Sequence, residues 1–133
     1  MEEGETPWFV GGLTRNVDNK KRVMFPAEWE GRYKKLLLWI PEKEKLIKEL
    51  QSSQQKILGI LAPSEEILLK IYDGDNYFDD IYSHLYEVNK GPRRRITLPK
   101  QITNQMSKNK ITFIGCVEYI ALVQDSVSSL LRR

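Results

Sequence analysis

Short apolar runs alternate with polar, turn-forming stretches along the whole chain. Runs of this length, bounded by glycine, proline, asparagine and charged residues, are typical of β-strands. For residues 34–40 the pattern alone also allows a helix, and the length of the run favours a strand. The predicted strands are WFVGGLTRN (8–16), RVMF (22–25), KKLLLWI (34–40), KILGIL (56–61), ILLKIYD (67–73), SHLYEV (83–88), RITL (95–98), KITFIG (110–115) and YIALVQ (119–124). The 56–61 and 67–73 strands are expected to form a hairpin around the turn APSEE.

Helices are expected mainly where a proline or a capping side chain precedes a helical pattern. Pro26 and Pro99 suit a first helical position and predict short helices in AEWEGRY and KQITNQMS. The acidic stretch DGDNYFDDIY (73–82) has the start of a calcium loop but lacks its glycine and its final glutamate, so a capped helix is the better interpretation. Amphipathic helices are predicted for residues 41–55, with Leu46, Ile47 and Leu50 on one side, and for residues 125–133, with Val127, Leu130 and Leu131.

One stretch of the chain occurs twice. The segment NVDNKKRVMFP (16–26) returns as NKGPRRRITLP (89–99), and both Arg22 to Arg95 and Pro26 to Pro99 are 73 positions apart. A repeat at this interval indicates two copies of one small β module, at 8–81 and 82–133. Neither copy is large enough to close a core alone, so a single mainly β domain spanning 1–133 is expected, built as one pseudo-twofold barrel with short helices. The predicted core is Val23, Phe25, Ile57, Ile60, Ile96, Leu98, Ile111, Phe113, Ile120 and Leu122.

The composition fits one water-soluble domain without evident catalytic chemistry. The chain has 133 residues, of which 41% are hydrophobic and 29% charged. It contains no apolar run of membrane-spanning length, and its acidic start is unlike a signal peptide, so a cytoplasmic location is expected. One cysteine (Cys116) excludes an internal disulfide, and one histidine (His84) excludes a multi-histidine metal site. We therefore expect no enzyme activity, no metal and no cofactor.

Basic residues concentrate in the second part of the chain. Residues 1–85 carry a formal charge of −3 and residues 86–133 a charge of +6. Such asymmetry is a weak indication of a polyanionic partner, and on charge alone a solvated surface is the better explanation.

The repeated segment also carries the candidate binding chemistry. Each copy places its arginine beside a basic turn; the predicted DNA-binding residues are Lys20, Lys21, Arg22, Arg93, Arg94 and Arg95. Arginine can donate two hydrogen bonds to guanine in the major groove, whereas lysine suits phosphate attraction. Asp18 is predicted to brace the first turn or to orient Arg22. The alternative is that Asp18 only stabilises a turn and that the arginines protect an exposed hairpin end from aggregation.

The segment VDNKKRVMFPAEW resembles the signature of the MraZ proteins, regulators built from two AbrB-like (SpoVT-AbrB) modules. In that signature an aspartate is followed after three residues by an arginine, then by a short strand and a proline, and Asp18, Arg22 and Pro26 match it. In the second copy Arg95, Ile96, Leu98 and Pro99 match, and GCVEYIALVQ is similar to the last hairpin of the family. The chain departs from the pattern in three ways: Gly91 replaces the second aspartate, Lys21 replaces a glycine, and Trp39 to Gln55 looks like an insertion.

The resemblance implies a swapped-hairpin β barrel that assembles into a ring-like homo-oligomer. It also implies a nucleoid-associated transcriptional regulator that binds repeated short boxes in the promoter of a cell-division and cell-wall gene cluster. A protein-interaction module of the same fold, without specific DNA binding, is the alternative. Neither membrane binding nor a small-molecule substrate is expected.

Overall fold

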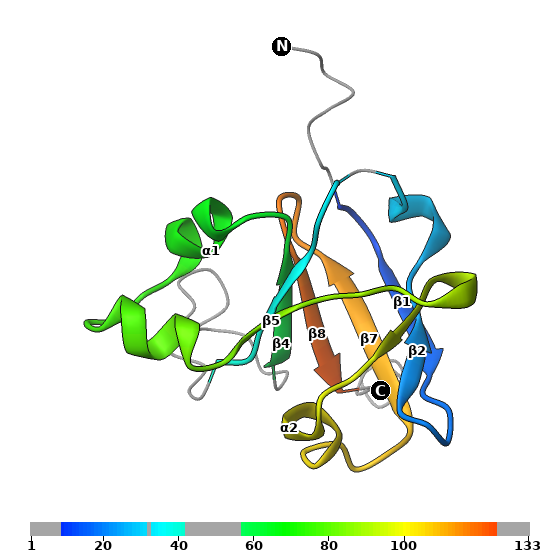
Figure 1. Ribbon diagram of the computed structural model, residues 1–133. Helices are drawn as coiled ribbons and strands as arrows, with labels where there is room; N and C mark the ends of the chain where they lie inside the picture. The colour runs from blue at the N-terminus through cyan, green and yellow to red at the C-terminus, as the bar shows by residue number, and fades with distance from the viewer. Residues whose placement is uncertain (1–8, 32, 42–56, 125–133) are drawn as a thin grey trace, which may run out of the picture.

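The computed structural model describes residues 9–31, 33–41 and 57–124, and these residues are mainly β (Figure 1). The strands are β1 (Gly12–Asn16), β2 (Arg22–Met24), β3 (Leu37–Trp39), β4 (Ile57–Ala62), β5 (Leu85–Glu87), β6 (Arg95–Thr97), β7 (Lys110–Gly115) and β8 (Ile120–Gln124). The helical elements are η2 (Ala27–Trp29), α1 (Glu65–Ile71), η5 (Phe78–Tyr82), η6 (Pro92–Arg94) and α2 (Lys100–Thr103). The mainly β class predicted from the sequence is therefore correct.

The strands form two antiparallel units. Six of them make one sheet in the order β1-β7-β8-β4-β3-β5, and β2 and β6 pair only with each other as a two-stranded ribbon. A closed barrel would need the edge strands β1 and β5 to find further strand partners. The described strands instead leave the sheet open, so the prediction of a closed barrel is wrong for this part of the chain.

The order of strands in the sheet is symmetric. If each strand is replaced by its counterpart in the other copy, the same order results when the sheet is read from the opposite edge. The offset of 73 residues places β5 where β1 lies in the first copy, β6 where β2 lies and β7 where β3 lies. Four of the pairings join one copy to the other: β1 with β7, β3 with β5, β4 with β8, and β2 with β6. Each copy thus completes its hydrogen bonding on strands of the other.

The ribbon lies on the pseudo-twofold axis. Val23 is opposite Ile96, its own counterpart in the repeat, at the centre of the β2–β6 register. Two equivalent backbone bonds flank this pair: the Phe25 amide donates to the Arg94 carbonyl over 2.9 Å, and the Leu98 amide donates to the Lys21 carbonyl over 2.8 Å. The symmetry therefore extends to individual hydrogen bonds.

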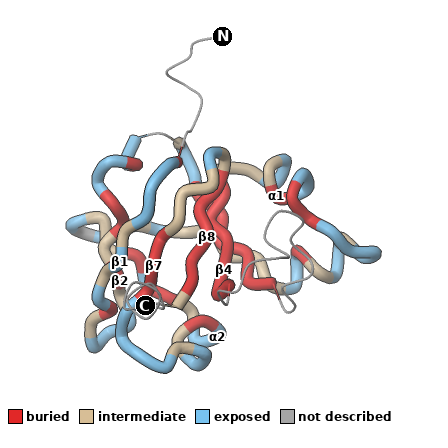
Figure 2. Tube along the Cα trace, turned by 180° about the vertical axis from the view of Figure 1, so that it is seen from behind, coloured by how far each residue is buried: buried red, intermediate tan, exposed pale blue. Residues whose placement is uncertain are grey.

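Buried residues run along the central strands β4 and β8 (Figure 2), and two apolar clusters pack against the six-stranded sheet. On one face the ribbon residues Val23 and Ile96 pack with Phe113 and Leu122 in the larger cluster. On the other face a second cluster lies under α1 and η5 and includes Trp39. Burial on both faces explains why all six residues of β4 are buried. All ten predicted core residues are buried, with Ile57 and Ile60 in the second cluster.

The predicted strand over ILLKIYD is wrong, because its first five residues belong to helix α1. The Ser64 hydroxyl accepts a hydrogen bond from the Ile67 amide over 3.4 Å and caps the helix. Leu68 and Ile71, three positions apart, are buried against the sheet, which is helical spacing. The apolar run supplies the buried face of a short helix through Leu68 and Ile71, and the capping serine was the sequence signal that could have identified the helix.

The short helices expected after Pro26 and Pro99 are present as η2 and α2. Trp39 lies in β3, so the segment interpreted as an insertion begins after that strand. The predicted helices over 41–55 and 125–133 lie outside the described residues, apart from the buried Pro41. Among the described helices, none has the length and apolarity needed to span a membrane.

Gly115 and Gly12 provide a matched pair of substitutions that tests the packing of Phe9 against β7. A Cβ at Gly115 would lie 2.5 Å from the Phe9 carbonyl carbon, whereas one at Gly12 would lie 3.7 Å from its nearest neighbour, the Phe113 carbonyl oxygen. We expect Gly115→Ala to lower the free energy of unfolding by about 1–3 kcal/mol through overpacking. Gly12→Ala should change it by less than about 0.5 kcal/mol. Urea unfolding measures both, and equal effects would contradict the packing.

Candidate nucleic-acid interface

The β2–β6 ribbon carries an arginine from each copy on its outward face. Val23 and Ile96 point into the core and are 1% and 4% exposed, so their strand neighbours point away from it. Arg22 is opposite Thr97, and Arg95 is opposite Met24. The two arginines are therefore diagonal neighbours, about 7–8 Å apart by strand geometry.

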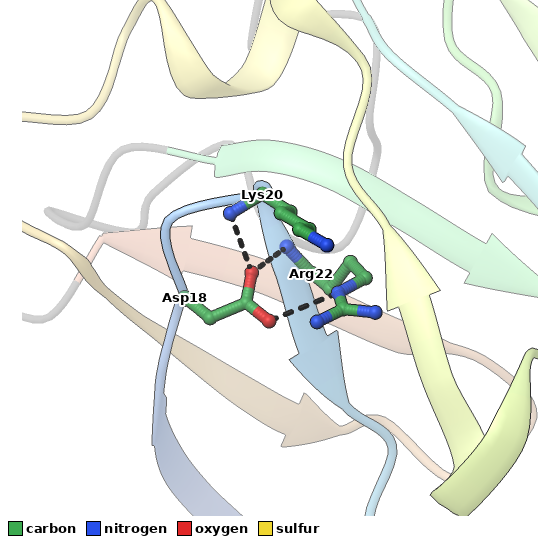
Figure 3. Close-up of polar contacts among 3 residues, drawn as sticks. All are labelled: Asp18, Lys20 and Arg22. Carbon is green, nitrogen blue, oxygen red and sulfur yellow. Dashed lines mark hydrogen bonds and ion pairs between the residues drawn. The ribbon is translucent and has the colours of Figure 1, made fainter.

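Asp18 organises the turn that precedes Arg22 (Figure 3). Its Oδ1 atom accepts hydrogen bonds from the amides of Lys20 and Arg22 over 2.9 and 2.8 Å, and its own amide donates to the Arg22 carbonyl over 2.9 Å. Lys21 closes the turn at φ 64°, a conformation that glycine adopts at lower cost. The predicted bracing role of Asp18 matches this geometry.

The same carboxylate orients the Arg22 side chain. Its Oδ2 atom accepts a hydrogen bond from the Arg22 Nε over 2.9 Å, and both side chains are about one-third exposed. Figure 3 shows this bond. Within the described part of the chain no other residue bonds to the guanidinium group, so its two terminal nitrogens can bind a ligand. Holding the side chain in place reduces the rotamer entropy that would otherwise be lost on binding.

The pKa of the Asp18 carboxyl group is lowered from its ordinary value of 3.8. The main cause is the hydrogen bond from the Arg22 amide, with further contributions from the Arg22 side chain and the Lys20 amide. Asp18 is therefore ionised throughout the neutral range and remains able to hold Arg22.

The second turn closes in a similar way but lacks the carboxylate, and Arg93 has a positive φ of 60° that its counterpart Lys20 lacks. The Gly91 amide donates to the Arg95 carbonyl over 2.8 Å, as the Asp18 amide does to Arg22. Arg94 has φ 58° at the position equivalent to Lys21. Gly91 has no side chain to accept the amide or guanidinium bonds that Asp18 accepts. Arg95 is consequently less constrained than Arg22.

Two basic side chains at the second turn, Lys90 and Arg94, are bonded to other residues of the fold. The Arg94 Nε donates to the Phe25 carbonyl over 3.2 Å, which ties this side chain to the other copy. Lys90 forms an ion pair with Glu30 over 2.6 Å, bonds to the Tyr33 hydroxyl and lies 5.3 Å from the Phe25 ring centre. Arg93 is exposed, so among the three predicted DNA-binding arginines of the second turn it is the most accessible to a binding partner.

The structure adds residues that the sequence analysis did not select. The Val17 amide bonds to the Asn109 carbonyl over 2.9 Å, and this contact brings Lys108 to the first turn. There Lys21 and Lys108 line a small cavity of about 110 Å³. The offset of 73 residues makes Lys35 the counterpart of Lys108. Lys35 is exposed, and the carbonyl of the next residue, Leu36, accepts a hydrogen bond from the amide of Val88, shortly before the second turn. Extending the repeat beyond Pro26 would have identified both lysines.

Arg15, in β1, is a further residue that was not predicted from the sequence. Its Nε atom is buried and has no hydrogen-bond partner in the described part of the protein. It lies three positions before Asp18 and adds positive charge near the first turn. We found no pattern in the sequence that distinguishes it.

The described residues were also compared with the requirements of a metal site and with known proteins. No group of three histidine, cysteine, aspartate or glutamate side chains is arranged there to hold a metal ion. No protein-family model matches the chain, and no curated protein is significantly similar to it.

The lowered pKa of Asp18 predicts how the stability of the first turn depends on pH. Because the folded state favours the ionised carboxylate, its stabilising effect is complete above the ordinary pKa and is lost as pH falls through the folded value. We expect Asp18→Ala to destabilise the protein at neutral pH and to differ progressively less from the wild type below about pH 4. Urea unfolding across this pH range tests it, with Asn19→Ala as the control. A difference that stays constant with pH would contradict the role of the charge.

Proposed function

We propose that this protein is a sequence-specific DNA-binding transcriptional regulator and not an enzyme. The observation that carries the proposal is Arg22, held by Asp18 on the outward face of a two-stranded ribbon with its terminal nitrogens open. An arginine in this state is preorganised for two parallel hydrogen bonds to one planar acceptor.

The dimensions of the ribbon suit the major groove. A two-stranded β-ribbon fits this groove of B-DNA, and arginine pairs there with the O6 and N7 atoms of guanine. Arg22 and Arg95, about 7–8 Å apart, match a separation of about two base-pair steps of 3.4 Å. Both arginines could therefore read bases from one docking position.

Lysines around the first turn would contact the DNA backbone. Lys20, Lys21 and Lys108 are exposed and lie on two segments joined by the bond between Val17 and Asn109. Phosphate contacts of this kind supply affinity and salt dependence but no sequence preference. Arg93 would serve the same purpose at the second turn, whereas the bond from Arg94 to Phe25 suits a structural role.

The finer assignment is a regulator of the MraZ type with two swapped-hairpin AbrB-like modules. It is supported by the repeated motif and by a strand order that is unchanged when the copies are exchanged. Such a protein would act in the cytoplasm on the nucleoid, as a ring-like homo-oligomer on repeated promoter boxes of a division and cell-wall gene cluster. Several weak sites on one assembly would bind such boxes by avidity.

The second candidate is an oligomeric interaction module that has lost specific DNA binding. It is favoured by the state of the second turn, where Gly91 provides no brace for Arg95 and where Lys90 and Arg94 are bonded within the fold. DNA binding that ignores sequence, or no DNA binding at all, would support this candidate.

Arg22→Ala tests base recognition. The substitution should cost about 1–3 kcal/mol of binding to the preferred sequence for each engaged site and should relax the sequence preference. Arg22→Lys should be nearly as damaging to specificity because lysine cannot form the bidentate pair. Fluorescence anisotropy with DNA from upstream of the protein's own gene, against a scrambled duplex, measures both effects.

Lys20→Ala is the matched control within the same turn. It should weaken binding to all sequences alike and should lower the slope of log affinity against log salt by about one. If Arg22→Ala and Lys20→Ala had the same effect on both duplexes, the ribbon would not read bases.

Gly91→Asp should give the second turn the brace that the first one has. A Cβ at Gly91 would lie 3.8 Å from its nearest neighbour, the Arg95 carbonyl oxygen, and therefore fits. An aspartate there could accept the amide and guanidinium hydrogen bonds of Arg95, as Asp18 does for Arg22. Binding to the preferred DNA should strengthen by about 0.5–1.5 kcal/mol because one long side chain is already ordered. Gly91→Ala controls for the loss of glycine, and an equal gain from alanine would refute the bracing effect.

A further inference from the structure

The segment with α1 and η5, residues 63–84, forms a lobe at the end of the molecule opposite the β2–β6 ribbon (Figure 1). This acidic lobe contains six carboxylates and one lysine. Glu66, Asp73, Asp75 and Asp79 are exposed. The ribbon and its turns are basic, so the two ends of one molecule carry opposite charge.

Large apolar side chains are exposed on the same lobe. Phe78 is 70% exposed, Leu69 55% and Tyr82 41%. The rings of Phe78 and Tyr82 lie 5.1 Å apart, and the Tyr82 hydroxyl bonds to Glu65, which precedes Leu69 by one helical turn. The three side chains thus follow one another along a single surface, and apolar patches with polar rims are typical of protein-interaction sites.

Hydrogen bonds within the lobe and to β3 hold the lobe in this arrangement. The Trp39 indole donates to the Asp80 carbonyl over 2.9 Å, and the Tyr72 hydroxyl bonds to the Asp80 carboxylate. The Asn76 side chain accepts a hydrogen bond from the Asp79 amide over 3.2 Å at the start of η5. The exposure of Phe78 and Tyr82 therefore belongs to an ordered surface.

We propose that the acidic lobe of one molecule binds the second basic turn of another copy of this chain. Arg93 is the exposed cation of that turn, and Lys34 and Lys35 are exposed on a neighbouring segment, which the Lys90–Tyr33 and Val88–Leu36 hydrogen bonds join to the chain before the turn. Gly91 provides no carboxylate of its own. The charges of the two surfaces are complementary, and an arginine can stack on Phe78 and Tyr82 while it pairs with the surrounding carboxylates. Because the lobe and the turns lie at opposite ends of the molecule, the contact joins different copies head to tail.

The first turn is a poorer partner for the lobe. Arg22 is already paired with Asp18 over 2.9 Å, so a second carboxylate would gain less there. Head-to-tail contact through the second turn would leave Lys20, Lys21 and Arg22 accessible, and in the joined copies it would engage Arg93 in association instead of in phosphate contacts. The inference concerns self-association and does not require that the protein bind DNA.

The test measures self-association of the full chain, freed of nucleic acid, by sedimentation velocity at micromolar concentration. The wild type should form species larger than a dimer at about 0.1 M salt and should dissociate at about 1 M salt, where screening is much shorter-ranged. Phe78→Ser in the lobe and Arg93→Asp in the turn should each weaken association by at least about tenfold. Both residues are exposed, so neither substitution should unfold the protein. Circular dichroism and thermal unfolding of each variant check this.

Mixing the two defective variants distinguishes a head-to-tail contact from general loss of association. Phe78→Ser retains an intact turn and Arg93→Asp retains an intact lobe, so their mixture should form one-to-one dimers but no larger species. Asp75→Arg combined with Arg93→Asp should restore association by exchanging the charges. Lys20→Glu, an equivalent change at the first turn, should leave association unchanged.

Three results would overturn the inference: a monomeric wild type at low salt, a mixture that stays monomeric, or a Lys20→Glu variant as defective as Arg93→Asp. None of these measurements contains DNA, so they succeed or fail independently of the proposed regulatory function.

Discussion

The contact between Val23 and Ile96 is the interaction on which most of the structure depends. These residues occupy the same position in the two copies, face each other across the ribbon and are almost fully buried. Their alternation with Arg22 and Arg95 means that burial of the apolar pair directs both arginines outward. The contact between Val23 and Ile96 therefore contributes to the core, sets the register of the ribbon and determines which face carries the candidate interface.

The symmetry set by this pair holds for the paired strands and for the residue that closes each turn, whereas Arg93 has a positive φ that its counterpart Lys20 lacks and the side chains of the two turns differ. Both turns close at a non-glycine residue with positive φ, at Lys21 and Arg94. The first turn has a carboxylate that orients its arginine, whereas the second uses Lys90 and Arg94 to bind Glu30 and Phe25. The second copy thus contributes more to holding the ribbon together, and the first presents the better-ordered arginine.

The sequence predicted those features that depend on the repeat or on local turn chemistry. The doubled proline and arginine located both ribbon strands, and the spacing of Asp18 and Arg22 anticipated their ion pair. Helix α1 was missed because a short buried helix and a short buried strand have similar composition, and only the capping Ser64 separated them. The open sheet, the partners of Arg94 and the position of Lys108 depend on contacts between distant segments, which a local pattern does not contain.

The interleaved pairing has a consequence for how the protein is made. β4 is apolar throughout and completes its pairing only when β8, some sixty residues later, is present. At synthesis rates of about 5–20 residues per second, this strand spends several seconds outside a finished sheet. The nascent chain therefore exposes an aggregation-prone segment, and the sheet around β4 can be completed only after β8 has left the ribosome.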